Sequence, residues 1–200
     1  MASIRAVAVY CASSDAIAAD HAEVARALGS AIAAQGWQLV YGGGGVGLMG
    51  AVARAALAGG AHVTGVIPHA LADREVALQE VTELIRTDTM RERKKIMDDR
   101  ADAFVVLAGG IGTLEELVEM ITLKQLGYHD RAIVVLDPTG YWDPLREQLD
   151  RMVALHFAHP ALLDLVQFTA SVEDTVAALR DYVPPPPISP TAHAREVLEP

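Results

Sequence analysis

Glycines, a threonine and a glutamate follow one short apolar run near the middle of the chain, and these residues are well suited to bind an anion. The run Ala103–Ala108 leads into Gly109 and Gly110, and the segment continues as IGTLEE, which ends at Glu116. A strand that turns through glycines into a helix leaves backbone N–H groups without partners, and it presents these donors to a ligand. A helix N-terminus also favours negative charge. The pattern therefore predicts a phosphate-binding loop with the Glu116 carboxylate nearby.

The same residues permit a purely structural interpretation. Thr113 and Glu116 have the spacing of a capping box, in which the threonine begins the helix and the glutamate reaches back to its N–H. Acidic residues in a first helical turn are also favoured by the helix dipole. This segment alone leaves both interpretations open.

A basic segment, MRERKKIM, precedes this loop and begins at Met90. At about 100° per residue, Met90, Met97 and Ala101 share one side of a predicted helix. Arg93 and Lys94 flank this apolar stripe. Their side chains either extend along apolar surface with the charged heads in solvent, or they serve an anionic or polar ligand at the mouth of the neighbouring strand. Arginine suits the second role because its guanidinium binds pairs of oxygens.

Together the two motifs resemble the LONELY GUY family of cytokinin riboside 5′-monophosphate phosphoribohydrolases, whose members carry an Arg-Lys pair followed by PGGxGTxxE. Ala108 follows Arg93 by fifteen positions and stands where the family usually has proline. A proline would stiffen the turn, but no side-chain chemistry is lost with alanine. The resemblance covers roughly residues 4–180, and its matching segments are MRERKKIM, DAFVVLAGGIGTLEELVEMIT, YGGGGVGLMG, VIPHAL and QLGYH.

Carried over residue by residue, the resemblance implies that Arg93 and Glu116 are the catalytic pair. It also implies a set of substrate-binding residues: Glu75, Lys94, Gly109, Gly110, Ile111, Gly112, Thr113 and Thr122. The implied reaction is hydrolysis of the N-glycosidic bond of N6-modified AMP, with AMP itself as a further expected substrate. The products are the free base and ribose 5-phosphate. The alternative is a nucleotide- or cofactor-binding carrier of the same fold, which would keep the anion cradle without turnover. The retained Arg93 and Glu116 favour the enzyme.

The glycine run YGGGGVGLMG satisfies the GxGxxG pattern twice, from Gly42 and from Gly45. Alone it suggests a dinucleotide-binding dehydrogenase. However, it follows the second predicted strand rather than the first, and the next strand ends in Pro68 and His69 instead of an acidic residue. We therefore favour a tight strand–helix turn beside the phosphate loop. The hydroxyls of the CASS segment that begins at Cys11 either contact the nucleotide at the same sheet edge or begin a helix.

Composition limits the classes of partner and cofactor. The chain has 200 residues and a net charge of −10, which argues against nucleic acid or an anionic membrane as partner. No apolar run reaches ~18 residues, so no membrane span is expected. The single cysteine fits a reducing, cytoplasmic location. The histidines lack metal-ligand spacing and the three lysines lack a pyridoxal-phosphate context, so we expect neither a metal nor another cofactor.

Apolar runs alternate with helix-period segments, which indicates an α/β protein with a mostly parallel sheet and helices on both faces. We predict a single Rossmann-like catalytic domain over residues 1–182 and a Pro-rich, disordered tail over residues 183–200. Strands are predicted at residues 4–10, 37–41, 62–67, 103–107 and 132–136, with weaker ones at 81–86 and 165–169. Helices are predicted at residues 16–34, 47–58, 89–101, 113–127, 142–156 and 172–182.

The helix after the phosphate loop predicts the assembly. One stripe is predicted to face the sheet and consists of Leu114, Leu117, Val118, Ile121 and Gln125. Met120 and Leu123 lie on the opposite side, with Glu116 beside them. A helix that is apolar on both sides is buried on both sides, so we expect a homodimer whose interface runs over this helix. The resemblance implies a homodimer as well.

Overall fold

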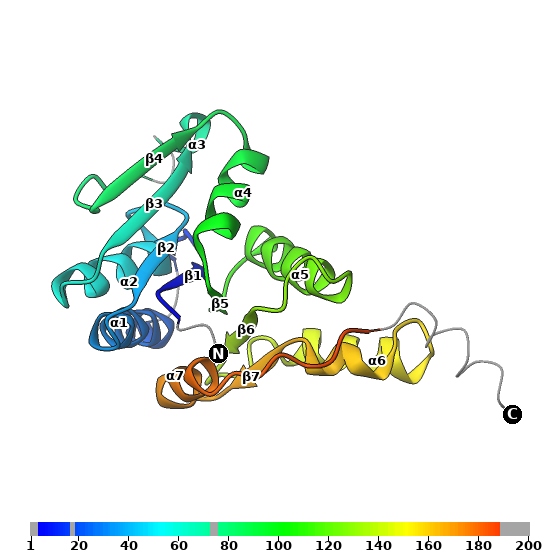
Figure 1. The fold of residues 1–200 in the computed structure, drawn as a ribbon. Helices are drawn as coiled ribbons and strands as arrows, with labels where there is room; N and C mark the ends of the chain where they lie inside the picture. Colours follow the sequence, from blue (N-terminus) through cyan, green and yellow to red (C-terminus); the bar gives the residue numbers. More distant parts are fainter. Residues whose placement is uncertain (1–3, 17–18, 73–75, 189–200) are drawn as a thin grey trace, which may run out of the picture.

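A single parallel sheet of seven strands organises the protein, and its strand order is β4-β3-β2-β1-β5-β6-β7. The computed structural model describes residues 4–16, 19–72 and 76–188 (Figure 1). The strands are β1 (Ala6–Tyr10), β2 (Gln38–Tyr41), β3 (Val63–Pro68), β4 (Glu83–Thr87), β5 (Ala103–Val106), β6 (Ala132–Leu136) and β7 (Gln167–Thr169). Each strand predicted from the apolar runs is confirmed, with boundaries that differ by a few residues.

The helices also follow the prediction, and two short ones are added. The helices are α1 (Ala19–Ala34), α2 (Gly47–Ala58), α3 (His69–Ala72), α4 (Met90–Arg100), α5 (Ile111–Gln125), α6 (Asp143–Ala154), the 3₁₀ helix η1 (Pro160–Asp164) and α7 (Val172–Arg180). Sequence periodicity did not predict α3 and η1, because one helical turn is too short to show a repeat.

Burial on both faces explains why the central strands are almost entirely apolar. Every residue of β1, β5 and β6 is buried, as expected for parallel strands covered by helices on each side. One core cluster joins the sheet to α1, α2 and α7, and the other joins it to α4, α5 and α6 (Figure 1). The α/β architecture predicted from the sequence is therefore confirmed.

The strand order reverses between β1 and β5. From β1 the chain builds outward through β2, β3 and β4, and then returns to place β5 on the other side of β1. In open α/β sheets, ligands bind in the crevice at the carboxyl ends of the strands at such a point. The loops that leave β1 and β5 meet there, since the N–H of Ala12 donates to the carbonyl of Ala108 at 3.1 Å.

Helix α5 is rotated relative to the prediction. Leu117 and Ile121 face the core as expected, but Val118 is 44% exposed, whereas Met120 is buried. The predicted assignment of Val118 and Gln125 to the sheet-facing stripe, and of Met120 to the opposite side, was wrong. The buried face of α5 carries three polar residues, and apolar periodicity cannot detect such a face. These residues are Thr113, Glu116 and Lys124.

The chain beyond α7 has no regular secondary structure in its described part, residues 181–188. Ile188 packs against the core cluster on the side of α6. The remainder of the predicted Pro-rich tail, residues 189–200, lies outside the described residues. Within the described part of the chain, no helix combines the length and apolar character needed to cross a membrane.

Candidate active site

A cavity of about 360 Å³ lies at the carboxyl ends of β1 and β5. It brings together residues that are remote in sequence: Arg93 from α4, and Gly110, Gly112, Thr113 and Glu116 from the loop after β5 and from α5. The segment after β1 and the helices α2, α3 and α4 complete its wall. These further lining residues are Cys11, Ala12, Ser13, Ser14, Met49, Leu71 and Met90, together with Ile111 and Glu115 from α5.

The loop after β5 ends in an uncapped helix N-terminus. Helix α5 begins at Ile111, and its N-cap Gly110 is extended and offers no side-chain hydrogen bond. Thr113 is thus the third helical residue instead of the cap, so the capping-box interpretation was wrong. The first amides of a helix have no acceptor within it, and here they line a cavity. This geometry favours the anion-binding interpretation of the loop.

Gly109 must be glycine because Thr113 packs against it. A Cβ at position 109 would lie 2.2 Å from the Thr113 Oγ1 and 2.6 Å from its Cβ. The threonine is buried and β-branched, so it has little freedom to move aside. The close approach draws the loop tightly onto the first turn of α5.

Residues after β6 hold the loop that follows β5. The indole Nε1 of Trp142 donates to the carbonyl of Leu107 at 3.2 Å, and the hydroxyl of Tyr141 donates to the carbonyl of Gly109 at 2.7 Å. The carboxylate of Asp137 in turn accepts the backbone N–H groups of Tyr141 and Trp142. Hydrogen bonds from outside the loop therefore restrain the backbone on both sides of Ala108.

Arg93 is buried, with 3% of its surface exposed. Its Nη2 donates to the carbonyl of Gly42 at 3.1 Å, and its Nη1 lies 3.8 Å from the sulfur of Met90. Among the described residues, its Nε has no hydrogen-bond partner. For Arg93 the interpretation of a charged head in solvent was wrong. A buried cation is costly unless it is paired, so this guanidinium is suited to an anionic or oxygen-rich ligand.

Glu116 is also buried, and it occupies the cavity wall on the first turns of α5. It lies close enough to β1 to affect Tyr10. Burial, and after it the charge of Glu116, raises the pKa of the Tyr10 hydroxyl well above its ordinary value. A carboxylate and a guanidinium from two different helices therefore face one cavity, which can hold a polar ligand between them.

Other predicted site residues lie elsewhere. Lys94 pairs with Glu115 at 2.5 Å and with Glu119 at 3.0 Å on the outer side of α5. Burial tends to lower the pKa of Lys94, but the hydrogen bonds to the two carboxylates outweigh this and raise it. Thr122 is exposed, and its hydroxyl donates to the carbonyl of Val118 at 2.7 Å. Neither Lys94 nor Thr122 lines the cavity, so a nucleotide-binding role for them stays a prediction. Glu75 lies outside the described residues.

Some residues around the cavity were not singled out from the sequence. Met49 and Leu71 contribute apolar surface to the cavity. Tyr141 donates a hydrogen bond to the loop after β5, and Asp137 accepts one from the backbone of the segment that contains Tyr141. The sequence carries a weak signal for the second pair only. An aspartate directly follows the buried strand that ends at Leu136, and polar residues at such strand ends often serve a site.

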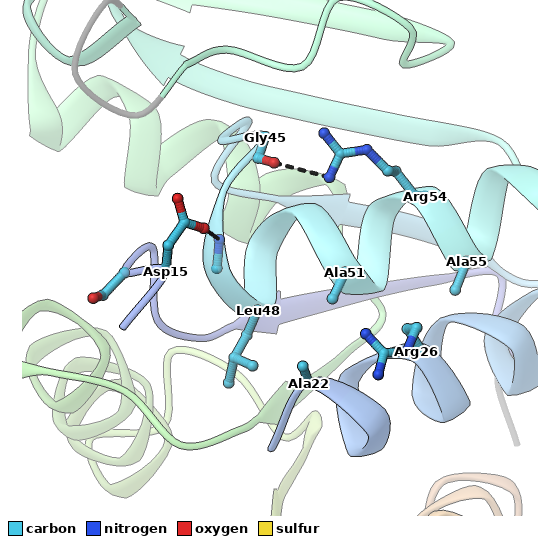
Figure 2. Close-up of a pocket in the computed structure, with 10 residues that line it drawn as sticks. Asp15, Ala22, Arg26, Gly45, Leu48, Ala51, Arg54 and Ala55 are labelled. Carbon is cyan, nitrogen blue, oxygen red and sulfur yellow. Dashed lines mark hydrogen bonds between the residues drawn. The ribbon is translucent and has the colours of Figure 1, made fainter. Parts of the chain in front are cut away.

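Two glycines of the run after β2, Gly45 and Gly47, line a different cavity from the one that Arg93 and Glu116 line. This second cavity, of about 460 Å³, lies between α1, α2 and the segment containing Ser14 and Asp15 (Figure 2). The Asp15 carboxylate accepts the N–H of Gly47 at 2.8 Å, and the Arg54 Nη1 donates to the carbonyl of Gly45 at 2.9 Å (Figure 2).

The first backbone N–H groups of α2 therefore already donate hydrogen bonds within the protein. Asp15 binds the N–H of Gly47, and the carbonyl of Ala12 accepts the N–H groups of Leu48 and Met49 at 3.0 and 3.2 Å. A dinucleotide pyrophosphate would need such amides. This difference between α2 and α5 supports the view of the glycine run as a structural turn and weakens the dehydrogenase interpretation.

Known proteins resemble this chain over most of its length. Residues 49–179 match the sequence family described as "Possible lysine decarboxylase". A cytokinin riboside 5′-monophosphate phosphoribohydrolase of Mycobacterium tuberculosis is 48% identical over 172 residues, which cover 86% of this chain and 91% of the relative. The chain belongs to the cytokinin riboside 5′-monophosphate phosphoribohydrolase family. A member of this family from Arabidopsis thaliana is 39% identical over 178 residues, covering 89% of this chain and 84% of the relative.

More distant structures share the fold of this phosphoribohydrolase family. A molybdenum cofactor carrier protein from Chlamydomonas reinhardtii superposes with a TM-score of 0.66 at 23% identity, covering 88% of this chain and 96% of the other. A molybdenum cofactor binding protein from Rippkaea orientalis gives 0.65 at 22% identity, covering 88% and 96%. These likenesses confirm the fold, and the resemblance to the LONELY GUY family inferred from the sequence motifs is confirmed by the closer relatives.

Proposed function

We propose that this protein hydrolyses the N-glycosidic bond of N6-modified AMP, and of AMP itself, to the free base and ribose 5-phosphate. The observation that supports this most strongly is the placement of Arg93 and Glu116. Both are more than nine-tenths buried, and both line one cavity with the uncapped N-terminus of α5. The names of the relatives agree with this reaction.

In this proposal the 5′-phosphate binds the amides of the segment from Gly110 to Thr113, where the helix dipole favours an anion. Anchoring at the phosphate would place C1′ of the ribose toward Glu116. Cleavage of the bond builds positive charge on the sugar ring, as in other glycoside hydrolyses. A carboxylate beside the ring stabilises that charge or orients the attacking water. Water supplies the hydroxyl at C1′ and a proton, and the departing base takes up a proton.

Arg93 contributes a positive charge to the same cavity. Its guanidinium would bind an oxygen of the sugar or phosphate, or stabilise the electron density gained by the departing base. Because the phosphate is remote from the bond that breaks, its binding energy would serve to position that bond. We therefore expect the enzyme to prefer nucleoside 5′-monophosphates to nucleosides. The mechanism uses no metal or other cofactor.

The decisive assay incubates the purified protein with AMP, with isopentenyladenosine monophosphate and with adenosine, and follows release of free base and ribose 5-phosphate. Base release from both nucleotides, with adenosine slower by at least about 100-fold, is the expected result. Tight nucleotide binding without release of base would instead favour the carrier alternative. Failure to bind either nucleotide would contradict both the hydrolase and the carrier proposals.

We also propose that the enzyme is a homodimer that assembles through the exposed face of α5. Ile111 is 82% exposed, and Val118 in the middle of α5 and Leu126 at its C-cap are exposed as well. Contiguous exposed apolar residues often mark an interaction site. Lys94 and Thr122 lie on this side of the molecule, so the proposed interface would bring them near a second copy. A cytoplasmic location is proposed from the single, buried cysteine.

A further inference from the structure

The guanidinium of Arg93 lies against a glycine of the β2–α2 turn. Gly42 directly follows β2, and its carbonyl accepts from the Arg93 Nη2 at 3.1 Å. A Cβ at position 42 would lie only 1.9 Å from that Nη2 and 3.1 Å from the Arg93 Cζ. The same Cβ would lie 2.9 Å from the terminal methyl of Met49. The guanidinium thus occupies the space that a side chain at position 42 would fill.

This carbonyl is the main restraint on a buried charge. Within the described part of the chain, it is the only oxygen that accepts a hydrogen bond from the Arg93 guanidinium, and the second contact of the guanidinium is to the sulfur of Met90. A guanidinium has five N–H donors, so one acceptor oxygen leaves further donors for a ligand. The direction of the whole group depends on one main-chain acceptor.

The turn that carries this acceptor is held at several points. The carbonyl of Gly43 accepts the N–H of Leu78 at 3.0 Å, and the N–H of Gly45 donates to the carbonyl of Val76 at 2.8 Å. The Nη1 of Arg54 donates to the carbonyl of Gly45 at 2.9 Å (Figure 2). A restrained main-chain carbonyl orients its hydrogen-bond partner more firmly than a flexible side chain would, because the carbonyl itself has little freedom to move.

We propose that Gly42 is a positioning residue for the reaction: its carbonyl and its empty side-chain position form a socket that sets the direction of the Arg93 guanidinium. The glycine run then has a role in catalysis that requires no contact with a phosphate. This inference rests on the proposed function, because the reaction assigned to the cavity gives the direction of Arg93 its importance.

An alanine at position 42 tests the socket with little threat to the fold. Gly42 does not have a positive φ, so alanine is compatible with its backbone. The atoms that the new methyl group meets are the ends of the flexible Arg93 and Met49 side chains. These ends can move, and the guanidinium is therefore displaced while the backbone stays in place.

The experiment compares wild type, Gly42→Ala, Arg93→Ala and the double variant in AMP hydrolysis, with melting temperatures measured in parallel. We expect Gly42→Ala to lose about 100-fold in kcat, as misplacement of a catalytic group by about 1 Å does. The double variant should be no slower than Arg93→Ala alone. Methylguanidine should restore part of the activity of Arg93→Ala, and none in the double variant, because the methyl group of Ala fills the socket.

A matched control places the same substitution at the C-terminal end of α2. At Gly59, whose φ is −81°, a Cβ would meet the Cβ of Ala33 at 2.4 Å, and its nearest neighbours include no atom of Arg93 or of the glycine turn. Gly59→Ala should lower the melting temperature without a selective loss of kcat. An equal loss of kcat in Gly59→Ala, wild-type kcat in Gly42→Ala, or losses that multiply in the double variant would each overturn the socket.

A crystal structure of Gly42→Ala separates this inference from the proposed function. If the wild type releases no base, the proposed function fails. The position of the Arg93 guanidinium in the crystal structure of the variant then tests the socket by itself. The inference expects the guanidinium to have left the carbonyl of residue 42. A hydrogen bond of about 3 Å between them in the variant would contradict it.

Discussion

The hydroxyl of Tyr141 donates a 2.7 Å hydrogen bond to the carbonyl of Gly109, at the point where β5 gives way to the phosphate-binding loop. Tyr141 belongs to the segment after β6, whose backbone is fixed by Asp137. The loop is thus braced by a neighbouring connection of the sheet.

Replacing Tyr141 with phenylalanine should loosen the loop without removing the ring. The loss of one hydrogen bond is worth about 0.5–1.5 kcal/mol, so we expect KM for AMP to rise roughly two- to tenfold and kcat to change less. Steady-state kinetics would measure both constants. Tyr128→Phe is the matched control, because Tyr128 is 76% exposed and far less constrained. An unchanged KM in Tyr141→Phe would show that the brace does not matter for binding.

Gly109→Ala should be more harmful than Tyr141→Phe. The added methyl group would overlap the buried Thr113 side chain, which forces the loop and the first turn of α5 apart. We expect a loss of stability of about 1–3 kcal/mol from overpacking, together with weaker nucleotide binding. Urea unfolding and calorimetric titration with AMP would measure these two effects. Wild-type values in both would refute the packing argument.

Lys124 should make stability depend on pH in the alkaline range. Its ammonium is buried and donates to the carbonyl of Leu165 and the hydroxyl of Tyr182. Burial lowers the pKa of Lys124 from 10.5 to about 8. Between these two values the folded chain holds fewer protons on this amine than the unfolded chain, so stability should increase as pH rises.

The titration of Lys124 should raise the free energy of unfolding by about 1–2 kcal/mol from pH 8 to pH 9.5. Urea unfolding of wild type and Lys124→Met at both pH values isolates this group. The methionine variant should lack the increase. If both proteins show the same dependence on pH, the amine does not titrate in this window.

Val118→Arg should disrupt the proposed homodimer. Val118 lies on the exposed face of α5, and a charge there would be buried without a partner on assembly. Analytical ultracentrifugation should detect a monomer, with the fold intact by circular dichroism. Phe157→Arg, which changes an 81% exposed residue beyond α6, is the control and should leave the assembly unchanged. A dimer that survives Val118→Arg would place the interface elsewhere.

The sequence predicted the strands and the phosphate loop because both depend on local patterns. Buried parallel strands appear in the sequence as continuous apolar runs, and a glycine-rich turn that leads into a helix can be recognised within one short segment. The orientation of α5 was not predictable in this way. Thr113, Glu116 and Lys124 are polar residues on its buried face. The hydrogen-bond partners of Lys124, the carbonyl of Leu165 and the hydroxyl of Tyr182, are distant in the chain.

Long-range contacts explain the other differences at the site. Arg93 is separated from Gly42 by about fifty residues, and Tyr141 from Gly109 by about thirty, so no local pattern reveals either contact. Lys94 follows Arg93 directly, but at 100° per residue it points to Glu115 and Glu119 instead of into the cavity.

Glu116→Gln is the most direct test of the central claim, which is that a buried carboxylate on α5 drives cleavage of the N-glycosidic bond. The substitution keeps the size of the side chain and removes its charge. We expect the variant to melt near the wild-type temperature and to bind AMP, while release of base falls by about 10²–10⁴-fold. Release of base at the wild-type rate from a folded Glu116→Gln protein would contradict the mechanism.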